Sequence, residues 1–433
     1  MILKETIKEI IIKNQSKDFT NIRKRDITIP VNTGKIISIT GVRRCGKTHL
    51  LFLTIRELLS SGINKQQIIF INFEDERLNF TSDNLDLIIQ SYRELFPAIK
   101  LNDVYFFFDE IQNTENWEKF IRRIYDTETK NIFITGSNSK MLSSDISTSL
   151  RGRNINIELF PLSFKEYLNF KNVEPDFHFP ENKAKIINEL SNFLQQGGFP
   201  EIINSKFSQK ILQDYYYVML YKDIIERYKI KNIPALKYFL NRIVLNTGKP
   251  SSINKIYNEL KSSGFKVSKD SLYLFAEYAE AIFLSFKLSK FDYSYIKQEK
   301  SEKKIYLIDN GLLNSLTFHF SENKGILLEN AVYLYLRQKH GNNVFFYKEK
   351  TECDFIIKDK DKITELIQVS YQIENNSTLK REIKGIENAA EYFNLKEGKV
   401  ITFDTEKETI VTNYGVKIQI IPVYKYFLAS NLL

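Results

Sequence analysis

The chain has 433 residues, 43% of them hydrophobic, which is enough for two or three domains with apolar cores. Its formal net charge is +9, a balance that suits contact with nucleic acid or an acidic partner and that the codon use of an AT-rich genome explains equally well. The two cysteines, Cys45 and Cys353, form no CxxC pair, so we expect neither a disulfide framework nor a structural zinc site. His49, His178, His319 and His340 have no ligand spacing and are taken as incidental.

The first 19 residues contain acidic side chains and no small-residue cleavage site, which argues against a signal peptide. No apolar run approaches the roughly 20 residues that a membrane helix needs. We therefore expect a soluble cytoplasmic protein without a membrane partner.

Residues 1–205 alternate strand-like and helix-like runs, which predicts a mainly parallel α/β sheet with helices on both faces. Amphipathic helices are expected at Asn84–Leu95 and Asn116–Asp126, and a turn-rich break at Gln195–Glu201 ends the segment. The predicted strands are Lys35–Ile39, Gln67–Glu74, Val104–Ile111, Asn131–Thr135 and Asn154–Leu159.

A phosphate-binding motif follows the first predicted strand. The run Gly41-Val42-Arg43-Arg44-Cys45-Gly46-Lys47-Thr48 fits G-x-x-x-x-G-K-[ST], and a helix is expected from Thr48 to Leu59. The glycines let backbone N–H groups face an anion, Lys47 would reach the β- and γ-phosphates, and the Thr48 hydroxyl would ligate Mg²⁺. The nucleotide-binding stretch is taken as Gly41–His49; the alternative is a glycine-containing turn without a ligand.

Two carboxylates end the third predicted strand. Asp109 follows the apolar run Val104–Phe108 and is expected to complete the Mg²⁺ shell that Thr48 begins. Glu110 is the candidate general base that polarises the attacking water. A plain Asp-Glu cap on a strand is the alternative.

Small polar and basic residues after the fourth predicted strand supply further candidates. Ser137, with Asn138 second, is placed to hydrogen-bond the γ-phosphate or the lytic water, or else forms a turn. Arg151 and Arg153 are candidates for an arginine that stabilises charge on the transferred phosphate, acting in its own chain or in a neighbouring one. Pairing with a structural carboxylate is equally open for both.

Residues 206–321 read as a helical linker followed by a winged helix-turn-helix. Helices are expected at Ser251–Leu260 and Ser268–Tyr278, around a turn with Gly264, followed by strands at Ala281–Leu288 and Lys304–Ile308. A helical spacer with a β-hairpin is the alternative. The pattern alone is weak evidence for DNA binding.

Residues 322–433 return to mixed α/β and look like a PD-(D/E)xK nuclease core. Glu329 and Asp354 occupy positions of the metal-binding carboxylates, whereas Gln368 and Ser370 stand where a Glu and a Lys belong. A neutral Gln is a poor Mg²⁺ ligand and Ser carries no positive charge, so the domain is expected to be degenerate. A lysine that has migrated to Lys380 or Lys384 is the alternative.

Several motifs occur in the order of a known family. They are GVRRCGKT, INFEDERL, FFFDEIQN, ITGSNSKML, LRGRNINIELFPLSFKEYL, GGFPE, KIYLIDNGLLNSL and ENAVYLYLR. Together they resemble the prokaryotic AAA-type ATPases with a C-terminal domain of unknown function, DUF4143. The resemblance implies an ATP-binding and ATP-hydrolysing core joined to a winged-helix and nuclease-like tail.

Three functions stay open at this point. The first is an ATPase whose nucleotide state moves the C-terminal region, with ATP and Mg²⁺ as its ligands. The second is an ATP-gated switch without robust hydrolysis that binds DNA or a protein partner. The third is an active Mg²⁺-dependent nuclease, which Gln368 and Ser370 argue against. The oligomeric state is left open.

Overall fold

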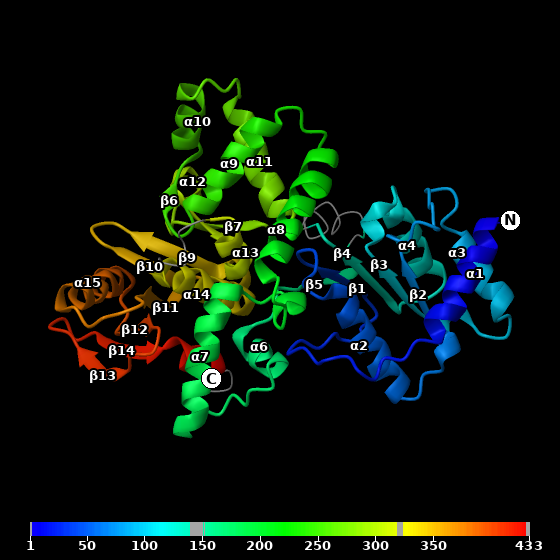
Figure 1. Ribbon diagram of the computed structural model, residues 1–433, viewed down its shortest axis with the longest axis horizontal. Coiled ribbons are helices and arrows are strands. Elements are labelled where there is room, and N and C mark those ends of the chain that lie inside the picture. The colour runs from blue at the N-terminus through cyan, green and yellow to red at the C-terminus, as the bar shows by residue number, and fades with distance from the viewer. Residues whose placement is uncertain (1, 139–149, 151, 318–323, 430–433) are drawn as a thin grey trace. The chain divides into compact units, whose positions relative to one another are not determined.

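The computed structural model describes residues 2–138, 150, 152–317 and 324–429, which fall into two compact units (Figure 1). The first consists of Met1–Phe160 with Ala281–Phe283, and the second of Pro161–Glu280 with Leu284–Leu433. The limit at residue 205 predicted from the sequence therefore lies inside the second unit. The reason is that the helices after Pro161 pack against later helices of that unit. No helix among the described residues is long and apolar enough to cross a membrane.

The first unit is built on a parallel sheet of five strands in the order β2-β3-β4-β1-β5. All five predicted strands are confirmed, and the prediction did not include the N-terminal helix α1. The strands are β1 Ile36–Thr40, β2 Ile68–Asn72, β3 Tyr105–Asp109, β4 Ile132–Gly136 and β5 Asn154–Glu158. The helices are α1 Ile2–Gln15, α2 Lys47–Ser60, α3 Leu87–Leu95 and α4 Trp117–Thr127.

The phenylalanines of β3 show how the sequence makes this sheet a central layer. Successive strand residues point to opposite faces, so Phe106 and Phe108 pack into one cluster with helices α1, α3 and α4. Phe107 points to the other face and stacks on Phe133 of β4 with ring centroids 4.7 Å apart. A strand that is apolar on both faces belongs in the middle of a covered parallel sheet. Asp109, the last residue of β3, therefore lies at the edge of the sheet formed by the carboxyl ends of the strands.

The middle of the second unit is a winged helix-turn-helix. Helix α9 (Ile233–Leu245) precedes the short strand β6 (Pro250–Ser251), helix α10 (Ile253–Ser262) and helix α11 (Lys269–Ala281). Strands β7 (Ser285–Ser289) and β8 (Lys303–Leu307) follow, with helix α12 (Tyr295–Lys300) between them, and the sheet order is β6-β8-β7. This order and connectivity confirm the winged helix. The predicted strand start at Ala281 is wrong, because α11 continues to that residue.

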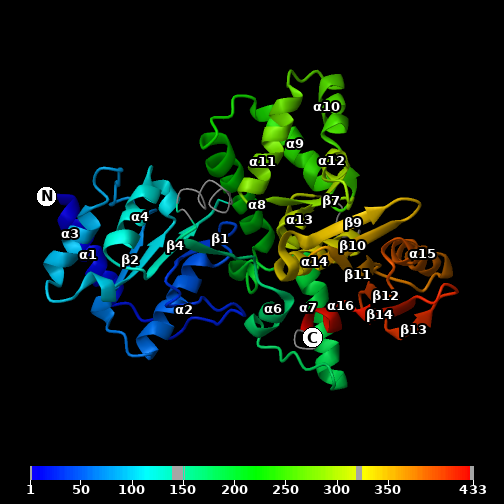
Figure 2. The same ribbon diagram turned by 180° about the vertical axis from the view of Figure 1, so that it is seen from behind.

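The C-terminal part has the topology of a restriction-endonuclease-like domain (Figure 2). A helix leads into three antiparallel strands, and a second helix crosses to a strand that pairs in parallel. Phe355 of β10 lies beside Tyr333 of α14, whereas the next residue, Ile356, packs with Ile386 of α15, so the two helices cover opposite faces. The elements are α14 Lys324–His340, β9 Val344–Lys348, β10 Glu352–Asp359, β11 Lys362–Val369, α15 Asn376–Phe393, β12 Glu397–Thr402, β13 Lys407–Val411, β14 Lys417–Pro422 and α16 Val423–Leu428.

A group of helices joins these two parts of the second unit. They are α6 Phe164–Phe170, α7 Pro180–Gln196, α8 Ser208–Val218, the π-helix Met219–Glu226 and α13 Asn310–Ser315. Asp309 caps α13 and also accepts a hydrogen bond from the backbone N–H of Gly198, at 2.7 Å, while its other oxygen accepts from Leu312 N–H at 2.9 Å. Burial raises the pKa of this carboxyl to about 6, against the effect of these N–H donors.

Gly197 is packed so closely against Asp309 that an added Cβ would overlap the Asp309 carboxyl group. Its φ is +81°, and an added Cβ would lie 2.1 Å from Asp309 Oδ1. Gly264 has nearly the same φ, +83°, but no atom of the described part of the chain lies within 4 Å of its Cβ position. We expect Gly264→Ala to cost about 1 kcal/mol from backbone strain, and Gly197→Ala about 1–3 kcal/mol more from overlap. Urea unfolding followed by circular dichroism measures the difference.

The single tryptophan makes that measurement specific to one unit. Trp117 is buried in the core of the first unit, so its fluorescence reports unfolding there. Gly197→Ala should shift the circular dichroism transition and leave the fluorescence transition in place. Equal stability of the two alanine variants would contradict the close packing at Gly197.

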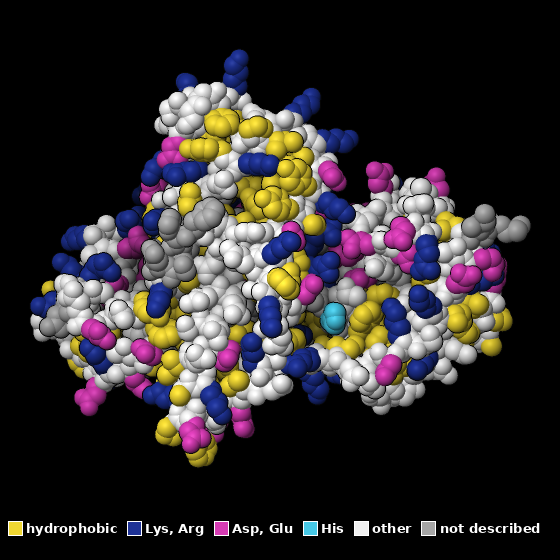
Figure 3. All heavy atoms as spheres, viewed as in Figure 1, with side chains coloured by type: hydrophobic (Ala, Val, Ile, Leu, Met, Phe, Trp, Pro, Cys, Tyr) yellow, Lys and Arg dark blue, Asp and Glu magenta, His cyan; other side chains and the backbone are white. Residues whose placement is uncertain are grey.

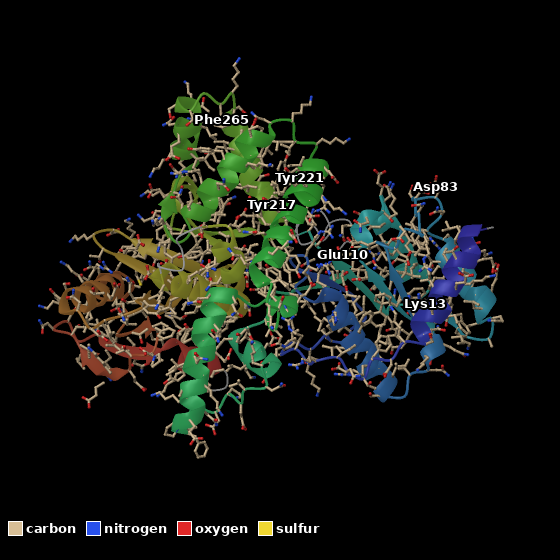
Figure 4. All side chains as sticks on the ribbon, viewed as in Figure 1. Lys13, Asp83, Glu110, Tyr217, Tyr221 and Phe265 are labelled. Carbon is tan, nitrogen blue, oxygen red and sulfur yellow. The ribbon has the colours of Figure 1, made fainter. Side chains whose placement is uncertain are left out.

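An exposed apolar surface runs along α8 and the π-helix. Tyr217, Val218 and Tyr221 are 55%, 39% and 40% exposed. Figure 3 shows hydrophobic side chains gathered on the face where Figure 4 labels Tyr217 and Tyr221. Large side chains of this kind, contiguous on one face, are typical of a surface that meets a partner.

Candidate functional site

The loop from Gly41 to Gly46 has a backbone that requires glycine at both of its ends. A Cβ on Gly41 would lie 2.1 Å from the carbonyl oxygen of Leu159, and Gly46 has a φ of +103°. Helix α2 begins at Lys47 with Gly46 at its N-cap, and no side chain caps it. Gly46 has no side chain to cap the helix, so this end of α2 resembles an anion site at a helix N-terminus, and the backbone N–H of Lys47 donates to the Cys45 thiol.

Lys47 lies inside the loop, 4% exposed. Its Nζ donates to the carbonyl oxygens of Gly41 at 3.1 Å and Val42 at 3.2 Å, and lies 3.1 Å from Glu110 Oε1. Burial alone would lower the pKa of Lys47, but the charge of Glu110, aided by Asp109, raises it above its ordinary value. The ammonium is thus held charged within a buried loop.

The Asp109 side chain, at the end of β3, is hydrogen-bonded to the start of α2 and to the neighbouring strand β4. The Thr48 hydroxyl donates to its Oδ2 at 2.8 Å, and the Thr135 hydroxyl, from β4, donates to its Oδ1 at 2.6 Å. Burial and the nearby Glu110 charge raise the pKa of Asp109 to about 6, against the effect of these two donors. A carboxylate with a raised pKa beside a hydroxyl is a site that favours an added cation.

Glu110 follows directly, at a φ of +52°, where non-glycine residues are uncommon (Figure 4). Its backbone N–H donates to Thr135 Oγ1 at 2.8 Å, and its Oε2 accepts from Gln112 Nε2 at 2.5 Å. Burial would raise the pKa of Glu110, but Lys47 and Gln112 lower it to about 2. In this arrangement Glu110 is ionised and paired with Lys47.

These residues fit a nucleoside triphosphate with Mg²⁺. The uncapped helix N-terminus and Lys47 supply donors and positive charge for phosphate oxygens. Thr48 and Asp109 supply two oxygens in contact with one another, and Mg²⁺ typically keeps several waters and takes only one or two protein ligands. Among the described residues no group of three or more His, Cys, Asp or Glu is spaced to hold a metal by itself.

Of the remaining residues predicted for the site, some lie near Glu110 and others point elsewhere. Ser137 is buried beside Glu110, with its Oγ 3.4 Å from Gln112 Nε2, and Asn138 is buried next to it. His49 is exposed on α2, and its ring lies edge-on to the ring of Phe52. Arg43 forms an ion pair with Glu74 at 2.7 Å.

Arg153 lies at the far edge of the sheet. It precedes β5, whose first residue Asn154 is in register with Ile36 at the start of β1, whereas the phosphate loop follows the end of β1. Its guanidinium pairs with Asp126 at 3.1 Å. The structure therefore contradicts a role for Arg153 at the phosphate site of its own chain; action on a neighbouring chain stays a prediction. Arg151 lies outside the described residues.

Three residues of the site escaped the sequence analysis. Thr135 bridges Asp109 and Glu110, and its position at the end of a predicted strand was the available signal. Gln112 orients Glu110. Arg25 donates to the carbonyl oxygens of Cys45 at 2.9 Å and Phe160 at 3.0 Å, and no sequence pattern pointed to it.

A parallel sheet with this loop, Lys47-Thr48 and the Asp109-Glu110 pair defines the core of a P-loop NTPase. A family model for an AAA domain matches residues 33–168, so this region is an AAA-type P-loop domain. The chain belongs to one family with the uncharacterized protein MJ1544 of Methanocaldococcus jannaschii, which is 39% identical over 97% of this chain and 94% of that protein. An uncharacterized protein of Haemophilus influenzae is 31% identical over 80% of this chain and 85% of its own length.

The second unit matches a different model from the one expected. Residues 187–323 match a domain of unknown function, DUF8612, where the resemblance had implied DUF4143. Among solved structures, the Aeropyrum pernix ORC1 protein in complex with DNA is similar with 12% identity and a TM-score of 0.31, over 74% of this chain and 93% of that chain.

Proposed function

We propose that the protein binds ATP with Mg²⁺ and hydrolyses it, and that its nucleotide state is coupled to the winged-helix and nuclease-like parts of the second unit. The observation that carries the proposal is the hydrogen-bonded chain from Thr48 through Asp109 and Thr135 to Glu110. It gathers a metal-ligand pair and a candidate base at the carboxyl edge of the sheet, next to the phosphate loop.

Each residue of the site has a separate role in this reaction. Bound Mg-ATP supplies the phosphoanhydride bond and a charge that polarises it. Lys47 and the N-terminus of α2 hold phosphate oxygens, and Thr48 with Asp109 holds the metal. Glu110 Oε accepts a proton from water once Lys47 is no longer its partner, because the ammonium is what keeps its pKa low. Ser137 and Gln112 orient Glu110 or the water.

DNA is the first candidate partner. The net charge of +9 and the winged helix support it, together with the exposed lysines Lys255, Lys261, Lys266 and Lys269 on or near α10 and α11. A protein partner is the second candidate, which the exposed face of Tyr217, Val218 and Tyr221 favours.

The test is steady-state ATP hydrolysis by the wild-type chain with and without duplex DNA. The rate of the Glu110→Gln variant is measured in parallel and subtracted as background hydrolysis. We expect turnover that DNA raises, with an effect that falls as salt increases, since phosphate contacts release counterions. Turnover indifferent to DNA at every salt concentration would transfer the proposal to the protein partner. No nucleotide binding by the wild type would refute it.

A further inference from the structure

A buried lysine stands at the centre of the nuclease-like part. Lys304 lies on β8 of the winged-helix sheet and is 1% exposed. Its Nζ is 2.8 Å from Glu352 Oε1, 3.1 Å from Glu329 Oε1 and 3.2 Å from Asp354 Oδ1. Two of these carboxylates, Glu329 and Asp354, are the ones that the sequence pattern predicts as metal ligands. They come from α14 and β10, so one ammonium joins three separate elements.

The carboxylates around Lys304 have further partners of their own. Tyr306 donates to Glu329 Oε1 at 2.7 Å, and the backbone N–H of Val369 donates to Asp354 Oδ2 at 3.0 Å. Glu352 Oε2 pairs with Lys348 at 3.2 Å. Burial alone would lower the pKa of Lys304, but Tyr306 and the three carboxylates raise it well above its ordinary value. A buried polar network of this kind is favourable only when its members are satisfied, as these are.

Gln368 occupies the position where a PD-(D/E)xK nuclease has a metal-binding glutamate, and its hydrogen bonds favour an amide there. Its Oε1 accepts from the backbone N–H of Asp354 at 3.0 Å, and its Nε2 donates to Glu382 Oε2 at 2.6 Å. A glutamate here would set two buried carboxylates at hydrogen-bond distance. The candidate replacement lysines, Lys380 and Lys384, are both exposed, and Ser370 Oγ donates to the backbone of Gln372. The residues present therefore do not fit the divalent metal of a PD-(D/E)xK centre.

We propose that the Lys304 ammonium is the resident cation of this centre. It occupies the position among Glu329, Glu352 and Asp354 where a nuclease would hold its metal. The C-terminal domain is thereby a metal-independent body tied to the winged-helix sheet, and it moves with that sheet instead of cleaving DNA. This inference does not depend on hydrolysis at the phosphate loop.

Thermal unfolding of the full chain without nucleotide tests the proposal, followed by circular dichroism in EDTA and in Mn²⁺. Trp117 fluorescence, recorded in parallel, separates any effect of metal on the first unit. We expect the wild type to unfold at the same temperature in both solutions. Lys304→Met should unfold several degrees lower, and Lys304→Met/Glu352→Gln should recover part of the loss, because it removes one of the unpaired charges.

The matched control is Lys303→Met, on the same strand, where the lysine bonds to Gln298 and Ser289 and touches none of the three carboxylates. If Lys304→Met fails to fold, Glu352→Gln and Asp354→Asn carry the test, and each should lower the midpoint equally in EDTA and in Mn²⁺. Mn²⁺ stabilisation of the wild type that Asp354→Asn abolishes would overturn the proposal. So would metal-dependent DNA cleavage lost in Asp354→Asn, or equal stability of Lys304→Met and Lys303→Met.

Discussion

Replacing Glu110 by Gln is expected to lower ATP turnover by about 10²–10⁴-fold while nucleotide affinity stays at the wild-type level or rises. Gln keeps the shape of the side chain and the hydrogen bond from Gln112, but it cannot accept a proton from water. It also removes the charge that now pairs with Lys47, so the ammonium is freer to meet a phosphate oxygen. A loss in turnover without a loss in binding is what removal of a group that acts only in the transition state produces.

The measurement is single-turnover hydrolysis beside equilibrium binding of a non-hydrolysable analogue. Glu115→Gln is the matched control, since Glu115 is exposed and lies five residues further along the chain. If Glu110→Gln turns over ATP at nearly the wild-type rate, Glu110 is not the general base. Loss of binding instead would mean that Glu110 supports the loop and has no part in the chemistry.

The sequence predicted the first unit because its signals are local. Strands β1 to β4 are mainly apolar runs, β5 alternates polar and apolar residues, and β3 with its three phenylalanines is apolar on both faces. The phosphate loop is contiguous, so Gly41, Gly46, Lys47 and Thr48 could be assigned from spacing alone. The Asp109-Glu110 pair was found because it directly follows a buried strand.

What the sequence could not supply were contacts between distant segments. Thr135 meets Asp109 only because β4 lies next to β3, and Arg25 reaches the loop across 20 residues. Arg153 was a candidate because its residue type suits the chemistry. Because β5 pairs in parallel with β1 and Asn154 lies opposite Ile36, Arg153 lies at the edge of the sheet where β1 begins, away from the phosphate loop at the end of β1. This pairing cannot be read from the sequence.

Lys304 is the clearest case of information that pattern reading misses. The nuclease signature was sought within residues 322–433, where Gln368 and Ser370 broke it. The cation that completes the centre comes from β8, earlier in the chain and in another predicted domain. A division into domains by sequence therefore separated the lysine from the carboxylates that it neutralises.

Lys47→Met is expected to reduce the affinity for Mg-nucleotide by about 10- to 150-fold, which is the loss of one charged hydrogen bond worth about 1.5–3 kcal/mol. The same change acts on stability without nucleotide. Lys47 and Gln112 lower the pKa of Glu110 from the ordinary 4.5 to about 2, so Glu110 contributes stability above about pH 4.5 and loses it as the pH falls toward 2. The contribution is about 3 kcal/mol at neutral pH.

In Lys47→Met the main cause of that lowering is gone, so the variant should be less stable than the wild type at pH 7, and the gap should close below about pH 4.5. Asp109 works in the opposite direction in both proteins, because its pKa of about 6 makes stability rise as the pH falls through that value. Urea unfolding followed by Trp117 fluorescence at a series of pH values measures the gap. Lys35→Met, an exposed lysine that donates to Gly152, is the control and should show none. A difference in the free energy of unfolding between the two proteins that is constant from pH 7 to pH 3 would show that Lys47 stabilises the loop by packing. Lys47 would then not stabilise the protein by pairing with the charge of Glu110.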